Sequence, residues 1–424
     1  MVAIMVVTFA VLAIFGVHVA VALGLGVILA VVTASNFSLV TIMQRMVSGV
    51  DSYTLLAIPL FMLTGSLMNV GGITDRLFNF CKACVGHIRG GLGHVNVLAS
   101  MVFAGMSGSA VADAGGLGQV EIKAMNDEGY PPPFSAAVTA VSSCIGPIIP
   151  PSIPFVMYAT IAEVSPSNLF LAGLIPGICM GLGMMVTIYI LSFILKLPKS
   201  EKRASLKALW HAFVHAILPL MTIVIIMGGI MGGIFTPTEA SSVAAAYAFI
   251  LSFFVYKSIK LKDLPKIITD TVLSTAIVVF IMSASSPFSF VLIMNKVAST
   301  LATFVTTVAS NKFMILLLLN LIMIILGCFM EAGMLITLLT PLFLPIAKAI
   351  GLDLIQFGVI MCLNLMIGVV TPPVGMSLFV VSKLSRVSIE EMTKPVFTLL
   401  LPLLIVLMLV TYVPSFSLWF PSLF

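Results

Sequence analysis

The chain has 424 residues, of which 60% are hydrophobic and only 8% are charged, and its formal net charge is +5. A soluble globular domain carries about 25% charged residues, so this composition excludes an ordinary soluble protein and predicts a polytopic α-helical protein of the lipid bilayer. The positive charge does not indicate nucleic-acid binding, because the basic residues cluster in short loops between apolar segments.

Apolar segments in chain order predict about ten membrane spans. They are 1–15, 18–34, 52–70, 133–163, 168–195, 214–233, 238–256, 268–293, 355–382 and 395–418. Two further apolar segments, 93–124 and 312–347, are interrupted by "GMSGSAVADAGGLG" and "GCFMEAG". Each half of these two segments has about 15 residues, or about 22 Å of helix, which is short for a bilayer core of about 30 Å. Both segments are therefore predicted to be re-entrant helical hairpins.

Two short segments, 36–50 and 207–216, are amphipathic and are predicted to form separate helices that lie flat at the membrane interface. The loops 196–207 and 257–266 are rich in lysine and arginine, so the positive-inside rule places both in the cytoplasm. It follows that the first hairpin enters from the cytoplasm and the second from outside, with both chain ends outside.

Special residues recur at a spacing of 222 positions. Five positions match without a gap: Gly105 with Gly327, Gly129 with Gly351, Gly146 with Gly368, Pro150 with Pro372, and Pro151 with Pro373. Because the basic loops orient the two copies in opposite senses, this pattern indicates a secondary transporter built from inverted repeats.

Each copy carries a helix breaker inside an apolar segment, "GPIIPPS" at 146–152 and "GVVTPPVG" at 368–375. Proline cannot donate a backbone hydrogen bond, so both stretches should unwind the helix. Unwound backbone at membrane depth is tolerated where it is buried or lines a polar cavity, and its carbonyls can bind cations. We therefore hypothesise two Na⁺ sites, one in each half, with an organic anion between them. Proline kinks that bind nothing are the alternative.

Four polar side chains at depth are candidates for substrate binding or coupling. Asp113 lies just past the first hairpin tip and Glu331 lies at the second tip, where each could be a cation ligand, a hinge salt bridge or a subunit contact. Asn364, within the second broken helix, could face the cavity. Glu239 follows "TPT" at a helix start, where capping the helix is the alternative to a transport role.

The arrangement "GMSGSAVADAGGLG…GPIIPPS…GVVTPPVG" resembles the large membrane subunit of the tripartite ATP-independent periplasmic (TRAP) transporters over essentially the whole chain. The resemblance implies an elevator-type transporter of the bacterial inner membrane with Na⁺ coupling, a small membrane subunit and a soluble periplasmic substrate-binding protein. The cargo it implies is a carboxylate such as sialic acid or a C4-dicarboxylate, and we favour sialic acid slightly. Because the chain begins directly with the short first span, the small subunit is expected to be a separate chain.

The resemblance also implies site residues and domains. The first Na⁺ site would fall on Ser107, Ser109, Gly146, Ile149 and Pro150. The second would fall on Gly327, Gly368, Thr371 and Val374. Most of these contacts would be main-chain carbonyls. The scaffold would comprise 1–70, 164–293 and 387–424. The moving domain would comprise 71–163 and 294–386, with broken helices at 133–163 and 355–385.

Three other readings compete with this one. A self-sufficient Na⁺/dicarboxylate symporter of the same superfamily would resemble this fold but would carry a Ser-Asn-Thr triplet in each half, where this chain has "SGS" and "TPP". An ion channel would need a continuous polar pore, whereas inverted repeats with broken helices favour alternating access. An enzyme is not expected, because no catalytic pair or ATP-binding motif is present in the sequence.

Overall fold

The regular structure of the chain is helical. In the computed structural model of the protein, every residue is described except 35–36, 109, 199–202, 298–299, 301–302, 304–310 and 424. The described residues form helices and connecting turns, with no strand among them. Eight of these helices are long and apolar enough to cross a membrane. The prediction of an all-α polytopic membrane protein is confirmed.

Six of the eight long helices correspond to predicted spans. They are η1 with α4 (Tyr53–Leu56, Ala57–Val70), α10 (Pro166–Ile194), α11 (Leu206–Met231), α12 with η2 (Pro237–Ile250, Leu251–Val255), α13 (Leu264–Met294) and α19 (Ile389–Tyr412). The other two are the arms of the second hairpin, α15 (Lys312–Phe329) and α16 (Ala332–Ala349). Each arm has 18 residues, or about 27 Å of helix. The arms are longer than predicted because only two residues, Met330 and Glu331, interrupt the helix.

Two predictions about the first part of the chain and the amphipathic segments need correction. The first two predicted spans, α1 (Val2–Ile14) and α2 (Val19–Ala34), form helices of only 13 and 16 residues, which is short for a full crossing. A separate helix at α3 (Leu39–Ser48) is confirmed, but 207–216 is the beginning of the continuous helix α11. The apolar pattern runs through both parts of α11, and Pro219 is accommodated inside the helix.

The remaining helices form two matching series. The first comprises α6 (Gly91–Ser107), α7 (Ala110–Asp127), α8 (Pro132–Ser142) and α9 (Ile153–Ala162). The second comprises α15, α16, α17 (Leu354–Val369) and α18 (Met376–Ser385). Adding 222 to both bounds of α7 gives the bounds of α16. The helix α5 (Ile73–Val85) precedes the first series, and α20 (Pro414–Leu418) and η3 (Pro421–Leu423) follow α19. The internal repeat is thus visible in the helices themselves.

The two repeats pack by exchanging equivalent contacts. Helix α7 packs on α18, and their equivalents α16 and α9 pack on each other. In the same way, α10 packs on α17 and α19 packs on α8. Helix α2 packs on α13, and α12 packs on α4. The equivalent helices α10 and α19 also pack on each other. Reciprocal contacts of this kind are what a two-fold relation between repeats produces.

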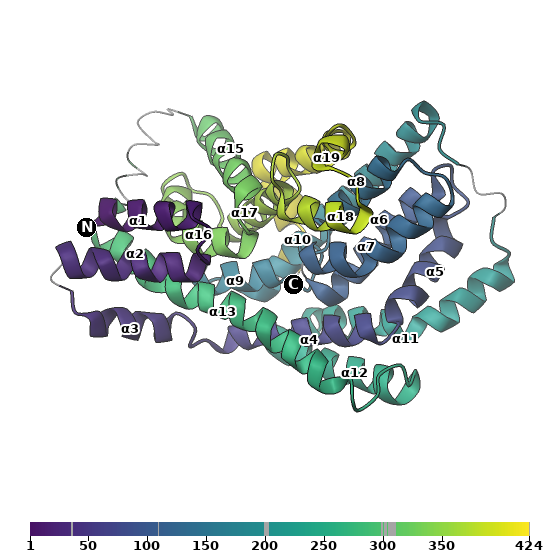
Figure 1. The fold of residues 1–424 in the computed structure, drawn as a ribbon, viewed down its shortest axis with the longest axis horizontal. Coiled ribbons are helices and arrows are strands. Elements are labelled where there is room, and N and C mark those ends of the chain that lie inside the picture. Colours follow the sequence, from purple (N-terminus) through teal and green to yellow (C-terminus); the bar gives the residue numbers. More distant parts are fainter. Residues whose placement is uncertain are drawn as a thin grey trace.

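The long helices α4, α11, α12 and α13 run along one side of the molecule, and α15, α17, α18 and α19 lie on the other (Figure 1). The two sides meet where α13 packs on α16 and where α4 packs on α6 and α9. Helices α10 and α19, which the predicted domains assign to the scaffold, make their main contacts with α6, α8, α9 and α17. Which helices move as one body stays a prediction, but the packing groups these two with the hairpins and broken helices.

The buried side chains form one large cluster from α4 to α19 and a smaller one where α1 and α2 pack on α13. Large apolar side chains remain exposed on the outer surfaces of α2, α11, α13 and α15, for example Val32, Val224, Leu273 and Leu321. Lipid tails solvate such a surface and water does not, so this distribution fits a bilayer environment.

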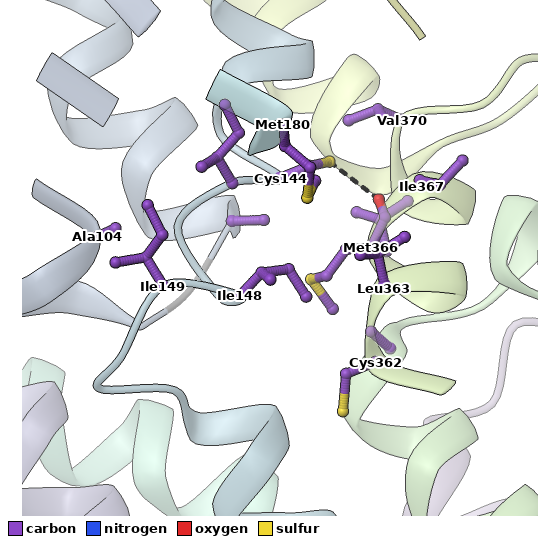
Figure 2. Packing of buried hydrophobic residues seen from close by; sticks show 14 of the residues in the cluster. Ala104, Cys144, Ile148, Ile149, Met180, Cys362, Leu363, Met366, Ile367 and Val370 are labelled. Carbon is purple, nitrogen blue, oxygen red and sulfur yellow. Dashed lines mark hydrogen bonds between the residues drawn. The ribbon is translucent and has the colours of Figure 1, made fainter. Parts of the chain in front are cut away.

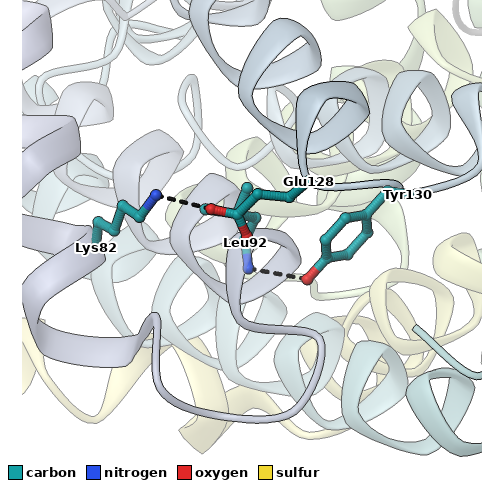
Figure 3. A network of polar contacts seen from close by, with 4 residues as sticks. All are labelled: Lys82, Leu92, Glu128 and Tyr130. Atoms are coloured by element: carbon teal, nitrogen blue, oxygen red, sulfur yellow. Dashed lines mark hydrogen bonds and ion pairs between the residues drawn. The ribbon is translucent and has the colours of Figure 1, made fainter. Parts of the chain in front are cut away.

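Polar contacts close the base of the first hairpin (Figure 3). The Leu92 amide donates to the Tyr130 hydroxyl oxygen at 3.2 Å, and the Lys82 ammonium lies 2.8 Å from a Glu128 carboxylate oxygen. Burial raises the pKa of Tyr130 to about 12, so its hydroxyl is neutral at physiological pH. At the base of the second hairpin, the Tyr412 hydroxyl donates to the Phe313 carbonyl at 3.2 Å. Both hairpins are therefore anchored at the end opposite their tips.

Candidate functional site

Both proline-containing stretches interrupt their helices, as predicted. No α-helix is assigned between Ser142, where α8 ends, and Ile153, where α9 begins, nor between Val369 and Met376 in the second half. We call residues 143–152 the first break and residues 370–375 the second break. Each contains one cis Pro–Pro bond, at Pro150–Pro151 and Pro372–Pro373. After the first break, the helix restarts where the Ser152 hydroxyl accepts a hydrogen bond from the Phe155 amide at 3.2 Å.

Each hairpin tip lies against the break of its own half. Gly108 at the first tip has φ +60°, and a Cβ there would stand 3.0 Å from the Pro151 carbonyl oxygen and 3.3 Å from the Ile153 nitrogen. Because Gly108 has no Cβ, the first tip can come this close to the backbone of the first break. At the second tip, the Gly375 amide donates to the Cys328 carbonyl at 3.0 Å.

Glycines also bring the helices together next to the breaks. A Cβ on Gly368 of α17 would lie only 2.6 Å from the Gly327 Cα of α15. Such contact of backbone with backbone is typical of small residues in membrane helices. In the first half, a Cβ on Gly146 would lie within 2.1 Å of an Asp113 carboxylate oxygen. Asp113 is buried, so its carboxylate is pressed against the backbone of the first break.

The two halves touch at equivalent positions. The Cys144 thiol donates to the Met366 carbonyl at 2.9 Å, and the two residues are 222 positions apart. Figure 2 shows this hydrogen bond, with Ile148 of the first break on one side and Leu363 of α17 on the other. The two broken helices are therefore in direct contact beside their breaks.

A small cavity of about 70 Å³ lies between both hairpin tips, the first break and the end of α17 that leads into the second break. We call it the central cavity. Its lining includes Gly108 and Pro147 from the first half and Glu331, Gly333 and Val369 from the second. Met62 of α4 and Val278 of α13 close it from the other side of the molecule. A space of this size holds a few water molecules or an ion, but it is too small for an organic acid of ordinary size.

A larger cavity of about 430 Å³ follows the central cavity along the same helices. We call it the serine cavity, because Ser48, Ser52, Ser285, Ser286 and Ser289 are among its lining residues. On α13, Val278 lines the central cavity and Met282 lines the serine cavity. On α9, Met157 lines the central cavity and Thr160 lines the serine cavity. Residues three and four apart lie one turn apart on a helix, so the two cavities are consecutive.

A polar network ties each hairpin to its broken helix. In the second half, the Asn364 side-chain Nδ2 donates to the Asn320 side-chain Oδ1 at 2.8 Å and to the Ile360 backbone carbonyl at 2.8 Å. In the first half, the hydroxyl of Ser142, which is equivalent to Asn364, donates to the Asn96 side-chain Oδ1 at 2.8 Å. Asn364 is fully buried between helices and does not line either cavity. The bond to Asn320 joins α17 to α15, and a role of Asn364 in substrate binding or coupling stays a prediction.

The other three coupling candidates have different surroundings. Glu331 lines the central cavity at the start of α16. Asp113 lies beside the first break, as described above. Glu239 is exposed and forms a capping box in which the Thr236 amide and hydroxyl both donate to its carboxylate at 2.8 Å. The capping interpretation of Glu239 fits this geometry.

The predicted cation ligands lie in or next to the two breaks. Ile149 and Pro150 are buried in the first break, and Ile149 packs against Gly177 of α10. In the second break, Thr371 donates its hydroxyl to the Ile367 carbonyl at 2.6 Å, and Val374 is 38% exposed. Ser109 and the side chain of Ser107 lie outside the described residues.

Sequence reasoning missed one buried acid and most of the cavity lining. Glu121 on α7 is 1% exposed, and neither of its carboxylate oxygens has a hydrogen-bond partner in the described chain. Nothing in its local sequence predicts that. The serine cavity did leave a signal, because "SASSPFS" at 283–289 is an unusual concentration of hydroxyls for a predicted span.

The family model of the DctM component of the tripartite ATP-independent periplasmic transporters matches residues 6–416. The chain belongs to this family. It is 45% identical over 384 residues to the sialic acid TRAP transporter large permease protein SiaM of Vibrio cholerae serotype O1, covering 90% of this chain and 89% of that one. It is 40% identical over 400 residues to the C4-dicarboxylate TRAP transporter large permease protein DctM of Pseudomonas aeruginosa, covering 94% and 93%.

A solved structure shares the fold at low sequence identity. The YdaH transporter of Alcanivorax borkumensis superimposes with a TM-score of 0.62 at 13% identity, covering 90% of this chain and 88% of that one. Family membership and the apolar helices establish a multi-pass membrane permease, which is a transporter and not an enzyme.

Proposed function

We propose that the chain is the large permease subunit of a Na⁺-coupled, binding-protein-dependent importer of an organic acid in the bacterial inner membrane. A separate small membrane subunit and a periplasmic substrate-binding protein complete the transporter. The relatives named for sialic acid and for C4-dicarboxylates support these two substrate classes. The observation that carries the proposal is the convergence of two hairpin tips and two broken helices on one central cavity.

The coupling cation would be bound mainly by backbone oxygens. The described residues contain no cluster of three or more His, Cys, Asp or Glu side chains that could hold a metal ion. The breaks instead offer carbonyls outside regular helix, and such oxygen ligands suit a hard cation. One Na⁺ would be held by Gly146, Ile149 and Pro150 with the serines of the first tip. The other would be held by Gly327, Gly368, Thr371 and Val374.

Buried carboxylates would supply the negative charge that makes cation entry favourable. Asp113 presses on the first break and Glu331 lines the central cavity. A carboxylate at membrane depth is costly unless a cation accompanies it. Bound Na⁺ would offset these charges, and the cavity would then accept an organic anion. This order of events couples the substrate to the ion gradient.

Alternating access would follow an elevator movement. The moving body would comprise the hairpins, the broken helices and the two helices α10 and α19 that pack on them. The scaffold would comprise α4, α11, α12 and α13. Because Met62 and Val278 of the scaffold close the central cavity, movement of the core along these helices would expose the site first to one side and then to the other.

The test is uptake of labelled sialic acid into proteoliposomes that hold this chain and its small partner subunit. We expect uptake to require both an inward Na⁺ gradient and the periplasmic binding protein. Uptake with Na⁺ alone would instead support a self-sufficient symporter. The same assay with labelled succinate decides between the two substrate classes.

A further inference from the structure

We propose that the serine cavity is a binding site for a hydroxylated monocarboxylate, in which the Arg45 guanidinium binds the carboxylate and the serine hydroxyls bind the substrate's hydroxyl groups. The inference rests on the proposed function and specifies the substrate class within it. Sugar acids with one carboxylate belong to this class, whereas C4-dicarboxylates do not.

The serine cavity lies on the side from which an imported substrate arrives. Helix α13 begins at Leu264, within the lysine-rich segment that the positive-inside rule assigns to the cytoplasm. Ser285 lies 285 − 264 = 21 residues further along α13, or about 32 Å at 1.5 Å per residue. That distance is close to the thickness of a bilayer core. The cavity is therefore near the opposite, outer surface.

Of the two cavities, only the serine cavity is large enough for an organic acid. Pockets for small molecules usually measure about 300–1,000 Å³, and the serine cavity has about 430 Å³. The central cavity, with about 70 Å³, is too small for the substrate in this conformation. A substrate that enters from outside would thus occupy the serine cavity first.

Arg45 supplies a fixed positive charge. Its guanidinium lies over the Phe290 ring, 4.5 Å from the ring centroid, and it forms no ion pair in the described part of the chain. Stacking orients the guanidinium plane and leaves edge N–H groups for bidentate binding of a carboxylate. The Ser283 hydroxyl donates to the Met46 carbonyl at 3.0 Å, which holds α3 against α13 and keeps Arg45 in position.

The other lining groups match hydroxyls better than a second carboxylate. The hydroxyls of Ser52, Ser286 and Ser289 make no hydrogen bond within the described chain, so they remain available as donors and acceptors. Asp51 also lines the cavity. Its carboxylate would repel the second carboxylate of a dicarboxylate. Arg45 would bind only one carboxylate, so the second would have no cationic partner beside Asp51.

Both sides of the molecule contribute to the serine cavity. Arg45 and Ser289 come from α3 and α13, whereas Thr160 comes from α9 and Thr337 from α16. Movement of the hairpins and broken helices past α13 would therefore change this cavity together with the central one. A substrate held by Arg45 would be passed toward Met157 and Glu331, which lie one step deeper.

The test measures equilibrium binding of labelled sialic acid to the complete membrane complex in nanodiscs, at saturating Na⁺ and without the binding protein. We expect Arg45→Gln to raise the Kd at least ten-fold and Arg45→Lys to restore part of the loss. The matched control is Arg76→Gln, because Arg76 also stacks on a ring, that of Tyr256 at 3.9 Å, but lies outside both cavities. Its Kd should equal that of the wild type.

Competition experiments identify the chemistry. The wild-type complex should prefer the acid over its uncharged methyl ester at least ten-fold, and Arg45→Gln should lose this preference. Asp51→Asn should strengthen competition by succinate. Wild-type binding by Arg45→Gln, or no binding by the wild-type complex, would overturn the assignment. Reconstituted wild-type protein that takes up no organic acid would instead overturn the proposed function itself.

Discussion

Cys144 and Met366 occupy equivalent positions in the two repeats and are joined directly, because the Cys144 thiol donates to the Met366 carbonyl at 2.9 Å. Cys144 lies at the start of the first break, and Met366 lies in the last turn of α17 before the second break. The two halves of the core thus meet at their symmetric point, next to the backbone that we assign to cation binding. This contact provides a physical route by which the two proposed cation sites would be coupled.

The close contact between Gly327 and Gly368 predicts a strict size limit. Gly368→Ala should lower the stability of the purified complex by about 1–3 kcal/mol, because the new Cβ would stand 2.6 Å from the Gly327 Cα and the helices would have to separate. Thermal unfolding in detergent measures this effect. The matched control is Gly115→Ala, since a Cβ there meets nothing within 4 Å and helix propensity should make it neutral or slightly stabilising. Equal melting temperatures for both variants would contradict the contact.

The carboxylate of Glu121, which has no hydrogen-bond partner among the described residues, predicts a stabilising substitution. Glu121→Met should raise the free energy of unfolding by about 1 kcal/mol or more, because an apolar side chain of similar volume replaces a buried polar group without a partner. The comparison variant is Glu128→Gln, which loses an exposed ion pair with Lys82 and should change stability by less than about 1 kcal/mol. A clear loss of stability in Glu121→Met would contradict this prediction, because it would show that the carboxylate makes a stabilising interaction.

The bond between Asn364 and Asn320 predicts energetic coupling between α17 and α15. Asn364→Ala should cost about 1–3 kcal/mol, because the Asn320 carbonyl oxygen loses its buried donor. A double-mutant cycle with Asn320→Ala should give a coupling energy of about 0.5–3 kcal/mol. The variants that remain folded should keep the wild-type half-saturating Na⁺ concentration. A changed Na⁺ affinity would instead support a role of Asn364 in coupling.

Bulky apolar side chains at the cation sites should abolish transport without preventing assembly. We expect Ser107→Leu and Thr371→Leu to lose Na⁺-dependent uptake, because each replaces a hydroxyl of a proposed cation site by a bulky apolar side chain. Size-exclusion chromatography with the small subunit checks assembly. Glu239→Gln is the control: it weakens the helix cap formed with Thr236 but should leave the Na⁺ dependence of uptake unchanged. Undiminished uptake in both leucine variants would remove the site assignment.

The breaks and hairpin tips were predictable because proline and glycine act on the backbone locally. A single proline such as Pro219 can be accommodated inside a helix. The pairs Pro150–Pro151 and Pro372–Pro373 each remove two successive backbone donors close after a glycine, so their positions indicated where the chain unwinds. The 222-residue repeat likewise required only matched positions. These features supplied the fold and the general location of the candidate site.

Other features depend on which segments become neighbours. From sequence alone, Asn364 could face a cavity or bond to another helix. The direction of its side chain depends on Asn320, which lies 44 residues earlier in the chain. The serine cavity combines four segments between Arg45 and Thr337, so no local pattern outlines it. The grouping of α10 and α19 with the core also follows from packing, since their apolar sequences resemble those of scaffold helices.

The transport mechanism that we propose has two cation sites, one in each repeat, which drive transport of an organic anion. Its most direct test is the dependence of sialic acid uptake on external Na⁺ concentration in proteoliposomes that contain the complete transporter. Two cation sites predict a sigmoidal dependence with a Hill coefficient above one, and loss of Na⁺-dependent uptake in Thr371→Leu. Uptake that proceeds at the same rate when choline replaces Na⁺ would contradict it.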